Sequence, residues 1–149
     1  MPVVLRRAAD QDFAYCRRIY FSEMSWIIEG LHLDRATQEI SFRQYWNPTQ
    51  IQILTLDDAD IGWLQTITEV DELFVGQIVV DRPFQRQGIG TEIMMRLIRE
   101  AAMANQVVRL SVVKINPVLR LYERLGFQIE REDDRKFYMK LDPDTSSFD

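Results

Sequence analysis

The run of residues 78–90 most constrains the fold of this chain. It reads Ile-Val-Val-Asp-Arg-Pro-Phe-Gln-Arg-Gln-Gly-Ile-Gly, an apolar strand that enters a turn with two glycines, and the apolar spacing of a helix follows. A strand that ends where a helix begins presents unpaired backbone N–H groups and the positive end of the helix dipole at one place. Gly88 and Gly90 allow close approach to the backbone, and Arg86 adds a charged donor. The run predicts a site for a phosphate-bearing ligand.

Two common phosphate-binding motifs do not fit this run. It has no Gly-Lys-Ser/Thr, so it is not a P-loop, and it lacks the third glycine and the acidic residue of a dinucleotide fingerprint. Strand–turn–helix units of this kind also occur for packing alone. The turn by itself therefore leaves a purely structural alternative open.

Length and composition predict one globular domain. The chain has 149 residues, 46% of them hydrophobic and 28% charged, which is enough for a core and argues against disorder. We expect the domain to span residues 1–141 and residues 142–149 to form a polar tail. The N-terminus lacks the apolar region of a signal peptide, and no apolar run approaches the ~18 residues of a membrane span. We therefore expect a cytoplasmic protein without a membrane partner.

Cysteine, histidine and net charge exclude several classes of function. Cys16 and His32 are the only cysteine and histidine, so the sequence predicts neither an internal disulfide nor a metal site. We interpret Cys16 as a core thiol and His32 as a surface or capping group. The net charge of −5 disfavours nucleic-acid binding. The segment from Glu29 to Glu72 contains nine acidic residues and only two arginines. This excess of negative charge favours a cationic substrate or, alternatively, reflects solvated turns and helix caps.

Periodicity and turn residues predict a mixed order of strands and helices. A helix begins after the cap Asp10 and frays near Ser25, residues 26–33 form a loop, and Asp34 caps a second helix that Asn47-Pro48 ends. A third helix follows the glycine turn to about residue 104, and a short fourth begins at Asn116-Pro117 and ends at Gly126. The predicted strands are residues 3–7, 50–56, 61–68, 72–80, 107–113 (buried on both faces), 127–130 and 136–141.

At this point the chain resembles the GCN5-related N-acetyltransferases (GNAT family). Gln85-Arg86-Gln87-Gly88-Ile89-Gly90 matches that family's acyl-CoA signature, Gln/Arg-x-x-Gly-x-Gly/Ala, and Asn116, Tyr122 and Gly126-Phe127 match its downstream Asn…Tyr-x-x-x-Gly-Phe segment. The predicted order of elements agrees from residue 3 to residue 141. The resemblance implies a single-domain α/β (α+β) fold with a mixed, mostly antiparallel sheet, helices on both faces, and a splay between two parallel strands.

The resemblance also implies acetyl-CoA as the cofactor. The backbone from Gln85 to Thr91 is then expected to hold the coenzyme A pyrophosphate, and the strand end at residues 78–80 to bind the pantetheine arm through unpaired amides. The implied cofactor-binding residues are Ile78, Val79, Val80, Gln85, Arg86, Gln87, Gly88, Ile89, Gly90, Thr91, Asn116 and Tyr122.

In such a fold an amine attacks the thioester directly, so the chain must supply an acid, a base and an oxyanion donor. We interpret Tyr122 as the acid for the leaving thiolate and a backbone N–H near Val80 as the oxyanion donor. Glu72 is the first choice of base, ahead of Asp71 and Glu69, with a water chain as the alternative. Core packing of Tyr122, helix capping by Asn116 and a solvated strand-end charge at Glu72 stay open as structural interpretations.

The sequence is compatible with three functions. The leading hypothesis is acetyl-CoA-dependent N-acetylation of a small-molecule or peptide amine. The alternatives are a sensor or structural domain that binds acyl-CoA without transfer, and an interaction module in which the turn is only structural. Residues 26–33 and 128–136 are the segments expected to shape the acceptor site. Trp26 and its apolar neighbours in the first segment could equally form a homodimer contact.

Overall fold

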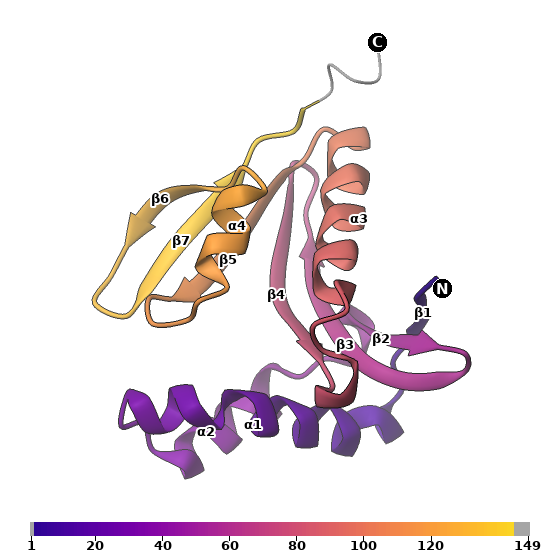
Figure 1. Ribbon diagram of the computed structural model, residues 1–149, viewed down its shortest axis with the longest axis vertical. Helices are drawn as coiled ribbons and strands as arrows, with labels where there is room; N and C mark the ends of the chain where they lie inside the picture. The colour runs from indigo at the N-terminus through magenta and orange to yellow at the C-terminus, as the bar shows by residue number, and fades with distance from the viewer. Residues whose placement is uncertain (1, 145–149) are drawn as a thin grey trace. The chain divides into compact units, whose positions relative to one another are not determined.

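The computed structural model describes residues 2–144, and a mixed sheet organises them (Figure 1). Seven strands lie in the order β1-β2-β3-β4-β5-β7-β6 within this part of the chain. They are β1 (Val4–Arg7), β2 (Ile51–Leu56), β3 (Ala59–Thr68), β4 (Glu72–Val80), β5 (Val107–Val113), β6 (Gln128–Glu132) and β7 (Lys136–Leu141). The α-helices are α1 (Phe13–Gly30), α2 (Arg35–Tyr45), α3 (Ile89–Met103) and α4 (Leu119–Arg124), and three 3₁₀ turns are η1 (Asp10–Asp12), η2 (Pro48–Gln50) and η3 (Arg82–Phe84).

One pair of strands in the sheet is parallel. β4 pairs with β5 from Glu72 opposite Val107 to Val75 opposite Leu110, whereas β1–β2, β2–β3, β5–β7 and β6–β7 are antiparallel. Both β4 and β5 continue beyond the last parallel pair, but their pairing within the described residues does not. This confirms the predicted mixed, mostly antiparallel sheet that splays between two parallel neighbours.

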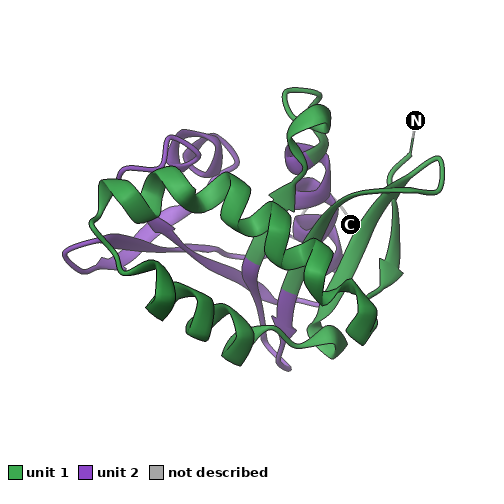
Figure 2. Ribbon diagram, turned by 90° about the horizontal axis from the view of Figure 1, so that it is seen from below, with its two compact units in different colours: residues 1–65, 77–89 green, residues 66–76, 90–149 purple. Residues whose placement is uncertain are grey.

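The chain divides into two compact units (Figure 2). Unit 1 comprises residues 1–65 and 77–89, and unit 2 comprises residues 66–76 and 90–149. The chain passes from one unit to the other within β3, within β4 and at the start of α3. Of the predicted polar tail, residues 142–144 lie outside helices and strands, and residues 145–149 lie outside the described part of the chain.

The core of unit 1 lies between α1 and the strands β2, β3 and β4. Its buried cluster consists of Cys16, Ile19, Ile51, Ile53, Trp63 and Val79. Cys16 is completely buried, and this burial raises the pKa of its thiol to about 11, with the Trp46 indole acting in the opposite direction. The thiol is thus a small apolar core group, as the sequence predicted, and a poor nucleophile.

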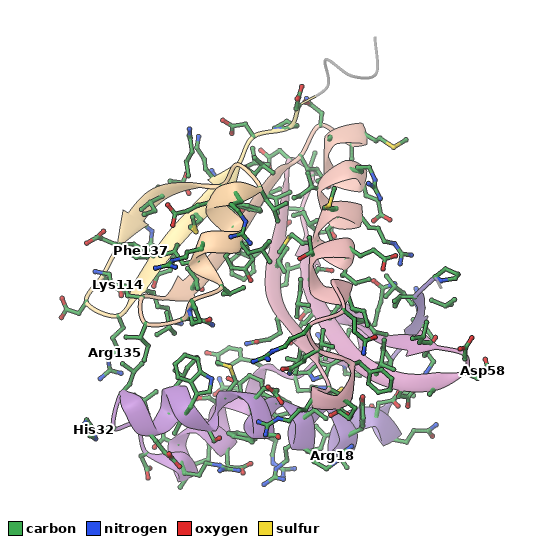
Figure 3. All side chains as sticks on the ribbon, in the orientation of Figure 1. Arg18, His32, Asp58, Lys114, Arg135 and Phe137 are labelled. Atoms are coloured by element: carbon green, nitrogen blue, oxygen red, sulfur yellow. The ribbon has the colours of Figure 1, made fainter. Side chains whose placement is uncertain are left out.

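The predicted loop at residues 26–33 is wrong, because α1 continues to Gly30. Ile27 and Ile28 are buried at 3% and 6% exposure, so their burial extends the helix past the weak stop signal at Ser25. The helix ends where His32 adopts a left-handed φ of 54° and the Leu33 N–H donates to the Ile28 carbonyl at 2.9 Å. His32 is therefore a helix-ending residue, consistent with its predicted capping role (Figure 3).

An ion pair between Arg6 and Asp12 joins β1 to the start of α1 within unit 1. The Arg6 guanidinium donates two hydrogen bonds to the Asp12 carboxylate, at 2.9 and 3.0 Å, and the Ala9 N–H donates a third at 2.8 Å. The Arg6 hydrogen bonds are the main cause that lowers the pKa of Asp12. The carboxylate is only 8% exposed, so its negative charge depends on these donors.

The tip of the β2–β3 hairpin also has a local cause. Asp57 and Asp58 both adopt left-handed φ angles, of 50° and 66°, which is the conformation of a two-residue turn that matches the twist of the strands. Figure 3 labels Asp58 at the tip of this hairpin. Aspartate tolerates this region better than most side chains. β3 begins at Ala59, two residues before the predicted start at residue 61, so the turn is shorter than expected.

In unit 2, β5 is buried mainly on one face. Val108, Leu110 and Val112 are buried, whereas the alternate residues are only partly covered. The prediction of a strand buried on both faces is therefore wrong. Arg109 explains the difference, because its guanidinium forms ion pairs with Glu72 on β4 at 3.3 Å and with Glu130 on β6 at 3.0 Å.

Candidate functional site

A short 3₁₀ turn connects β4 to the segment predicted to bind a phosphate. The Asp81 carboxylate accepts the Arg82 N–H at 2.9 Å, and the Asp81 N–H donates to the Ile61 carbonyl on β3 at 2.8 Å. Pro83 follows at a position where no N–H is required. Asp81 was not among the predicted site residues, although an aspartate before a proline-containing turn is a recognisable capping signal.

The side chain of Gln85 holds the turn to the end of β4. Its Nε2 donates to the Val80 carbonyl at 2.8 Å. The motif glutamine therefore positions the backbone that follows it. Because the side-chain amide is used in this way, we expect Gln85 to contact the cofactor through its main chain.

The backbone after Gln85 forms a concave group of donors. Arg86 and Gly88 both adopt left-handed φ angles, of 63° and 76°. Among residues 2–144, no acceptor takes the backbone N–H groups of Arg86, Gln87 or Gly88. α3 begins directly afterwards at Ile89, so the first N–H groups of a 15-residue helix add to this set. Successive free N–H groups in such conformations are typical of an anion site.

The space beside this turn fits a bound group. A Cβ atom built at Gly88 or at Gly90 would meet no atom within 4 Å. Packing within the described chain therefore does not explain the absence of a side chain at Gly90. Thr91 follows in the first turn of α3. The donors and the open space are compatible with a pyrophosphate, which stays the predicted ligand of this turn.

The end of β4 offers backbone to a ligand and side chains to the core. Val79 is 4% exposed and belongs to the core cluster of unit 1, while Ile78 and Val80 are half-buried. The parallel pairing with β5 stops at Val75, before all three residues. Two interpretations of this segment, core packing and backbone binding, are thus compatible.

Tyr122 lies on α4 in unit 2, and the Gly-Phe pair that follows it ends the helix. The Gly126 N–H donates to the Glu123 carbonyl and the Phe127 N–H to the Tyr122 carbonyl, both at 3.0 Å. Gly126 adopts a φ of 103°, which strongly favours glycine. These two bonds define a Schellman motif with Tyr122 and Phe127 at its paired apolar positions, and their rings lie 5.8 Å apart.

The hydroxyl group of Tyr122 has its proton available. No acceptor for it occurs among the residues that the structure describes. Burial raises the pKa of Tyr122, so the phenol stays protonated at neutral pH. This is the protonation state that a general acid requires.

Asn116 caps the turn that leads into α4. Its Oδ1 accepts the Val118 N–H at 3.0 Å, and its backbone carbonyl accepts the Leu119 N–H at 3.2 Å. The helix itself begins at Leu119, two residues later than predicted. Because the cap uses only the side-chain oxygen, the Nδ2 group is left to donate to a ligand.

Glu72, the candidate base, is the first residue of β4 in unit 2. Its carboxylate accepts a hydrogen bond from Arg109 at 3.3 Å and is 29% exposed. Arg109 is shared with Glu130. Glu72 thus has a structural role in joining β4 to β5.

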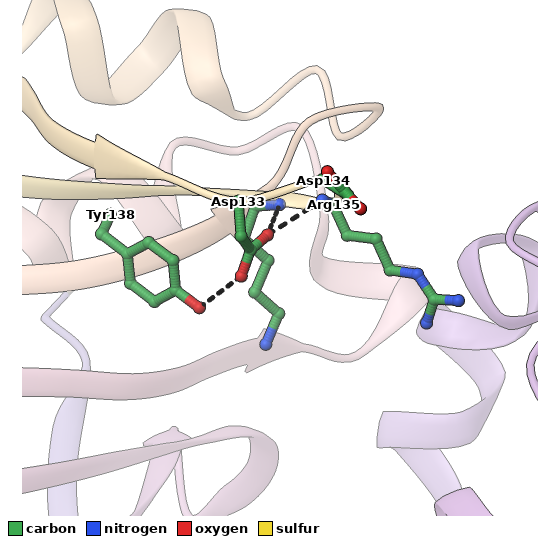
Figure 4. Close-up of a pocket in the computed structure, with 5 residues that line it drawn as sticks. Asp133, Asp134, Arg135 and Tyr138 are labelled. Atoms are coloured by element: carbon green, nitrogen blue, oxygen red, sulfur yellow. Dashed lines mark hydrogen bonds between the residues drawn. The ribbon is translucent and has the colours of Figure 1, made fainter.

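The hairpin between β6 and β7 is one of the predicted acceptor segments, and its tip forms an open surface depression (Figure 4). The Asp133 carboxylate accepts the backbone N–H groups of Arg135 at 2.9 Å and Lys136 at 2.7 Å, and the Tyr138 hydroxyl at 2.8 Å. The two backbone donors are the main causes that lower the pKa of Asp133 to about 2. This carboxylate is therefore a turn-forming group whose acceptor capacity is largely used.

None of the helices in residues 2–144 is long and apolar enough to cross a membrane. The same residues contain no group of three or more histidine, cysteine, aspartate or glutamate side chains that could hold a metal ion.

The splayed sheet and the glycine turn define a class of α/β protein that binds a phosphate-bearing ligand at the start of a helix. The chain belongs to the GNAT acetyltransferase family, because the model of the acetyltransferase (GNAT) domain matches residues 47–129, more than half of its length. Acetyl-CoA is the cosubstrate of this family. No curated protein sequence matches the chain.

Solved structures share the fold at low sequence identity. The PaiA N-acetyltransferase of Thermoplasma acidophilum, solved in complex with coenzyme A, is 15% identical, with a TM-score of 0.77 over 95% of this chain and 99% of that one. The ribosomal-protein-S18-alanine N-acetyltransferase of Escherichia coli is 20% identical, with a TM-score of 0.68 over 95% and 94%. The N-acetylglutamate synthase of Neisseria gonorrhoeae, complexed with coenzyme A and N-acetyl-glutamate, is 16% identical, with a TM-score of 0.66 over 97% of this chain and 36% of that longer one.

Proposed function

We propose that this protein is an acetyl-CoA-dependent N-acetyltransferase that moves an acetyl group directly from the thioester to a primary amine of a small molecule or peptide. The observation that carries the proposal is the turn at Arg86–Gly88, where three backbone N–H groups without an acceptor in residues 2–144 precede α3 beside open space. A pyrophosphate supplies the acceptors that these donors lack.

Several residues would hold the cofactor. The turn would bind the pyrophosphate, Gln85 would keep the turn against Val80, and the backbone of residues 78–80 would pair with the pantetheine amides. Asn116 would donate through Nδ2. Acetyl-CoA supplies an acyl carbon that is activated as a thioester.

Tyr122 is the proposed acid. Its phenol is protonated at neutral pH, and its hydroxyl has no acceptor among the described residues. By reference values, proton transfer from a phenol of pKa near ~10 to a thiolate whose acid has a pKa near ~8.5 is uphill. Burial raises the pKa of a thiol as well as that of a phenol, so desolvation alone does not remove this difference. Tyr122 therefore requires close placement to act.

The proton acceptor for the amine has two candidates. A primary amine with a pKa near ~10.4 is almost entirely protonated at pH 7 and must lose a proton before attack. Glu72 is one candidate, but one oxygen of its carboxylate already accepts a hydrogen bond from Arg109, which leaves fewer acceptor sites for the amine proton. This ion pair favours the second candidate, a water chain, and replacement of Glu72 decides between them.

An amine panel tests the proposal. The purified protein is incubated with acetyl-CoA and single primary amines, and release of free thiol and formation of the acetylated amine are both measured. We expect turnover with at least one amine, above the rate without amine. If coenzyme A raises the thermal midpoint but no amine is acetylated, the result favours a sensor or structural domain that binds acyl-CoA without transfer. If coenzyme A leaves the midpoint unchanged, the turn is only structural.

A further inference from the structure

Unit 1 contains a small cavity between α1, α2 and the strands β3 and β4, which we name the tryptophan cavity. Its volume is about 120 Å³. For comparison, an engineered apolar cavity of about 150 Å³ holds benzene. Five aromatic side chains contribute to its lining: Tyr20, Phe42, Tyr45, Trp46 and Trp63.

The rest of the lining is polar but uncharged. It consists of Gln38, Ser41, Gln65 and Gln77. The Gln65 Nε2 donates to the Tyr45 carbonyl at 2.9 Å and to the Gln50 side chain at 3.0 Å, which fixes its amide. Gln38 and Gln77 make no side-chain hydrogen bond to any described residue. The cavity therefore offers amide donors and acceptors, with no charged side chain in its lining.

Trp63 supplies an independent sign of a ligand. The residue is 1% exposed, and its Nε1 has no hydrogen-bond partner in the part of the chain that the structure describes. A buried donor without an acceptor loses its hydrogen bonds to water and gains none in return, so such groups are uncommon unless something else satisfies them. Trp46 Nε1 is also without a regular partner, but it lies near the Cys16 sulfur, a weak acceptor. Of the two indoles that line the cavity, Trp63 is thus the one without even a weak acceptor among the described residues.

The packing of the rings disfavours a cation as the occupant. Phe42 packs edge-on to Trp63, with centroids 6.0 Å apart and planes at 86°, and Tyr20 packs against Phe42 at 4.9 Å. A cation–π site needs ring faces that are open to the ligand. A carboxylate would equally lack a counter-charge in the lining. A small neutral group with an oxygen acceptor suits the size, the amides and the unpaired indole N–H.

The position of the cavity relates it to the cofactor segment within the same unit. Gln77 lines the cavity and directly precedes Ile78, the first residue proposed to bind pantetheine. Gln77 and Val79 lie on the same face of β4, because side chains alternate along a strand. We infer that the tryptophan cavity receives a small, uncharged, oxygen-bearing group of the amine acceptor, such as a carboxamide. That this group belongs to an amine acceptor rests on the proposed function. Binding of a small neutral group in the cavity does not depend on it.

Binding is tested without any transfer reaction. The ¹⁵N-labelled protein with coenzyme A is titrated with propionamide, propionate or protonated propylamine, and the Trp63 indole N–H signal, assigned by Trp63→Phe, is followed. We expect a saturable shift with propionamide and at least tenfold weaker binding of the two charged analogues. An unmoved Trp63 signal, or equal or tighter binding of a charged analogue, would overturn the inference.

Two glutamines on α2 provide a matched pair of variants. Gln38 lines the cavity, whereas Gln44 lies exposed on the same helix outside it. We expect Gln38→Leu to weaken propionamide binding at least fivefold and Gln44→Leu to leave it unchanged. Equal effects of the two substitutions would contradict a ligand site in the cavity.

Turnover separates this inference from the proposed function. Acetyl-CoA is the acyl donor, and three amines are compared as acceptors. β-Alaninamide, β-alanine and 1,3-diaminopropane carry a neutral, an anionic and a cationic group, respectively, remote from the reacting amine. We expect kcat/KM for the amide to be at least tenfold higher, with the preference lost in Gln38→Leu. Acetylation without preference, together with an unmoved Trp63 signal, would overturn the cavity and leave the function intact. A propionamide-dependent shift with no acetylation of any amine would support the cavity and refute the function.

Discussion

The backbone N–H of Phe127 donates to the carbonyl of Tyr122 at 3.0 Å, and the rings of the same two residues lie 5.8 Å apart. This pairing gives a physical reason for the Tyr-x-x-x-Gly-Phe spacing. The glycine provides the left-handed residue, the phenylalanine closes the helix, and both hold the turn that carries the tyrosine. Structure and proposed chemistry thus depend on the same six residues.

Gly126→Ala should destabilise the protein. The φ of 103° is unfavourable for alanine, and the new Cβ would lie 3.3 Å from a Leu141 methyl group. We expect a loss of about 1–2 kcal/mol in the free energy of unfolding, measured by urea denaturation. An unchanged midpoint would show that the motif contributes little to stability.

Tyr122→Phe should lower turnover by ~10²-fold or more, the usual size of an acid contribution, with coenzyme A affinity nearly unchanged. Because burial raises the pKa of Tyr122, the wild-type rate should show no alkaline loss from this group below about pH 10. Thiol release as a function of pH measures both effects. Wild-type turnover in the variant would remove Tyr122 from the mechanism.

Gly90→Val should separate ligand binding from stability. A Cβ at this position meets no atom of the described chain within 4 Å, so the unfolding free energy should change by less than about 1 kcal/mol. The acyl-CoA signature accepts alanine at this position, but the two methyl groups of valine would occupy the space proposed for the pyrophosphate, and we expect the Kd for coenzyme A to rise at least tenfold by calorimetry. Unchanged affinity would place the phosphate elsewhere.

Asp12→Asn should destabilise the protein at pH 7 but not in acid. Arg6 lowers the pKa of Asp12 in the folded state, so its stabilisation is present above the unfolded value near ~3.9 and is lost as the pH falls through the lower folded value. We expect a difference of about 1–3 kcal/mol at pH 7 that decreases as the pH falls below about 4. Thermal unfolding at several pH values measures it, with the exposed Asp10→Asn as the control.

Glu72→Gln decides the base. With a water chain as the acceptor, kcat should stay within about threefold of wild type, because the amide still accepts a hydrogen bond from Arg109. A loss of ~10²-fold, together with loss of the acidic limb of the pH profile, would instead assign the proton transfer to Glu72.

Strong local patterns predicted the central elements of the fold well. β4 and β5 have the predicted bounds, because alternating or continuous apolar residues end at clear turn residues. The extension of α1 was missed because Ser25 is a weak stop, and the burial of Ile27 and Ile28 outweighs it. Sequence spacing does not reveal which apolar residues find a partner.

The site was predictable where one segment forms it. The free N–H donors of the glycine turn follow from residues that are adjacent in the sequence. The hydrogen bonds that hold this turn in place do not, because Asp81 donates to the distant Ile61. Gln85 donates to Val80, which depends on how the chain folds back at the end of β4. The tryptophan cavity combines Tyr20, Phe42, Trp63 and Gln77 from four elements. No linear motif relates those positions, so only the folded chain brings them together.

The short parallel ladder between β4 and β5 has a consequence for handling the protein. Strand backbone without a neighbour is a template for pairing with another chain, which is how edge strands cause aggregation. A ligand that pairs with residues 78–80 would therefore also act as a guard against self-association. We expect protein without coenzyme A to precipitate sooner on storage than protein with coenzyme A bound. The cosubstrate would then also keep this protein in solution.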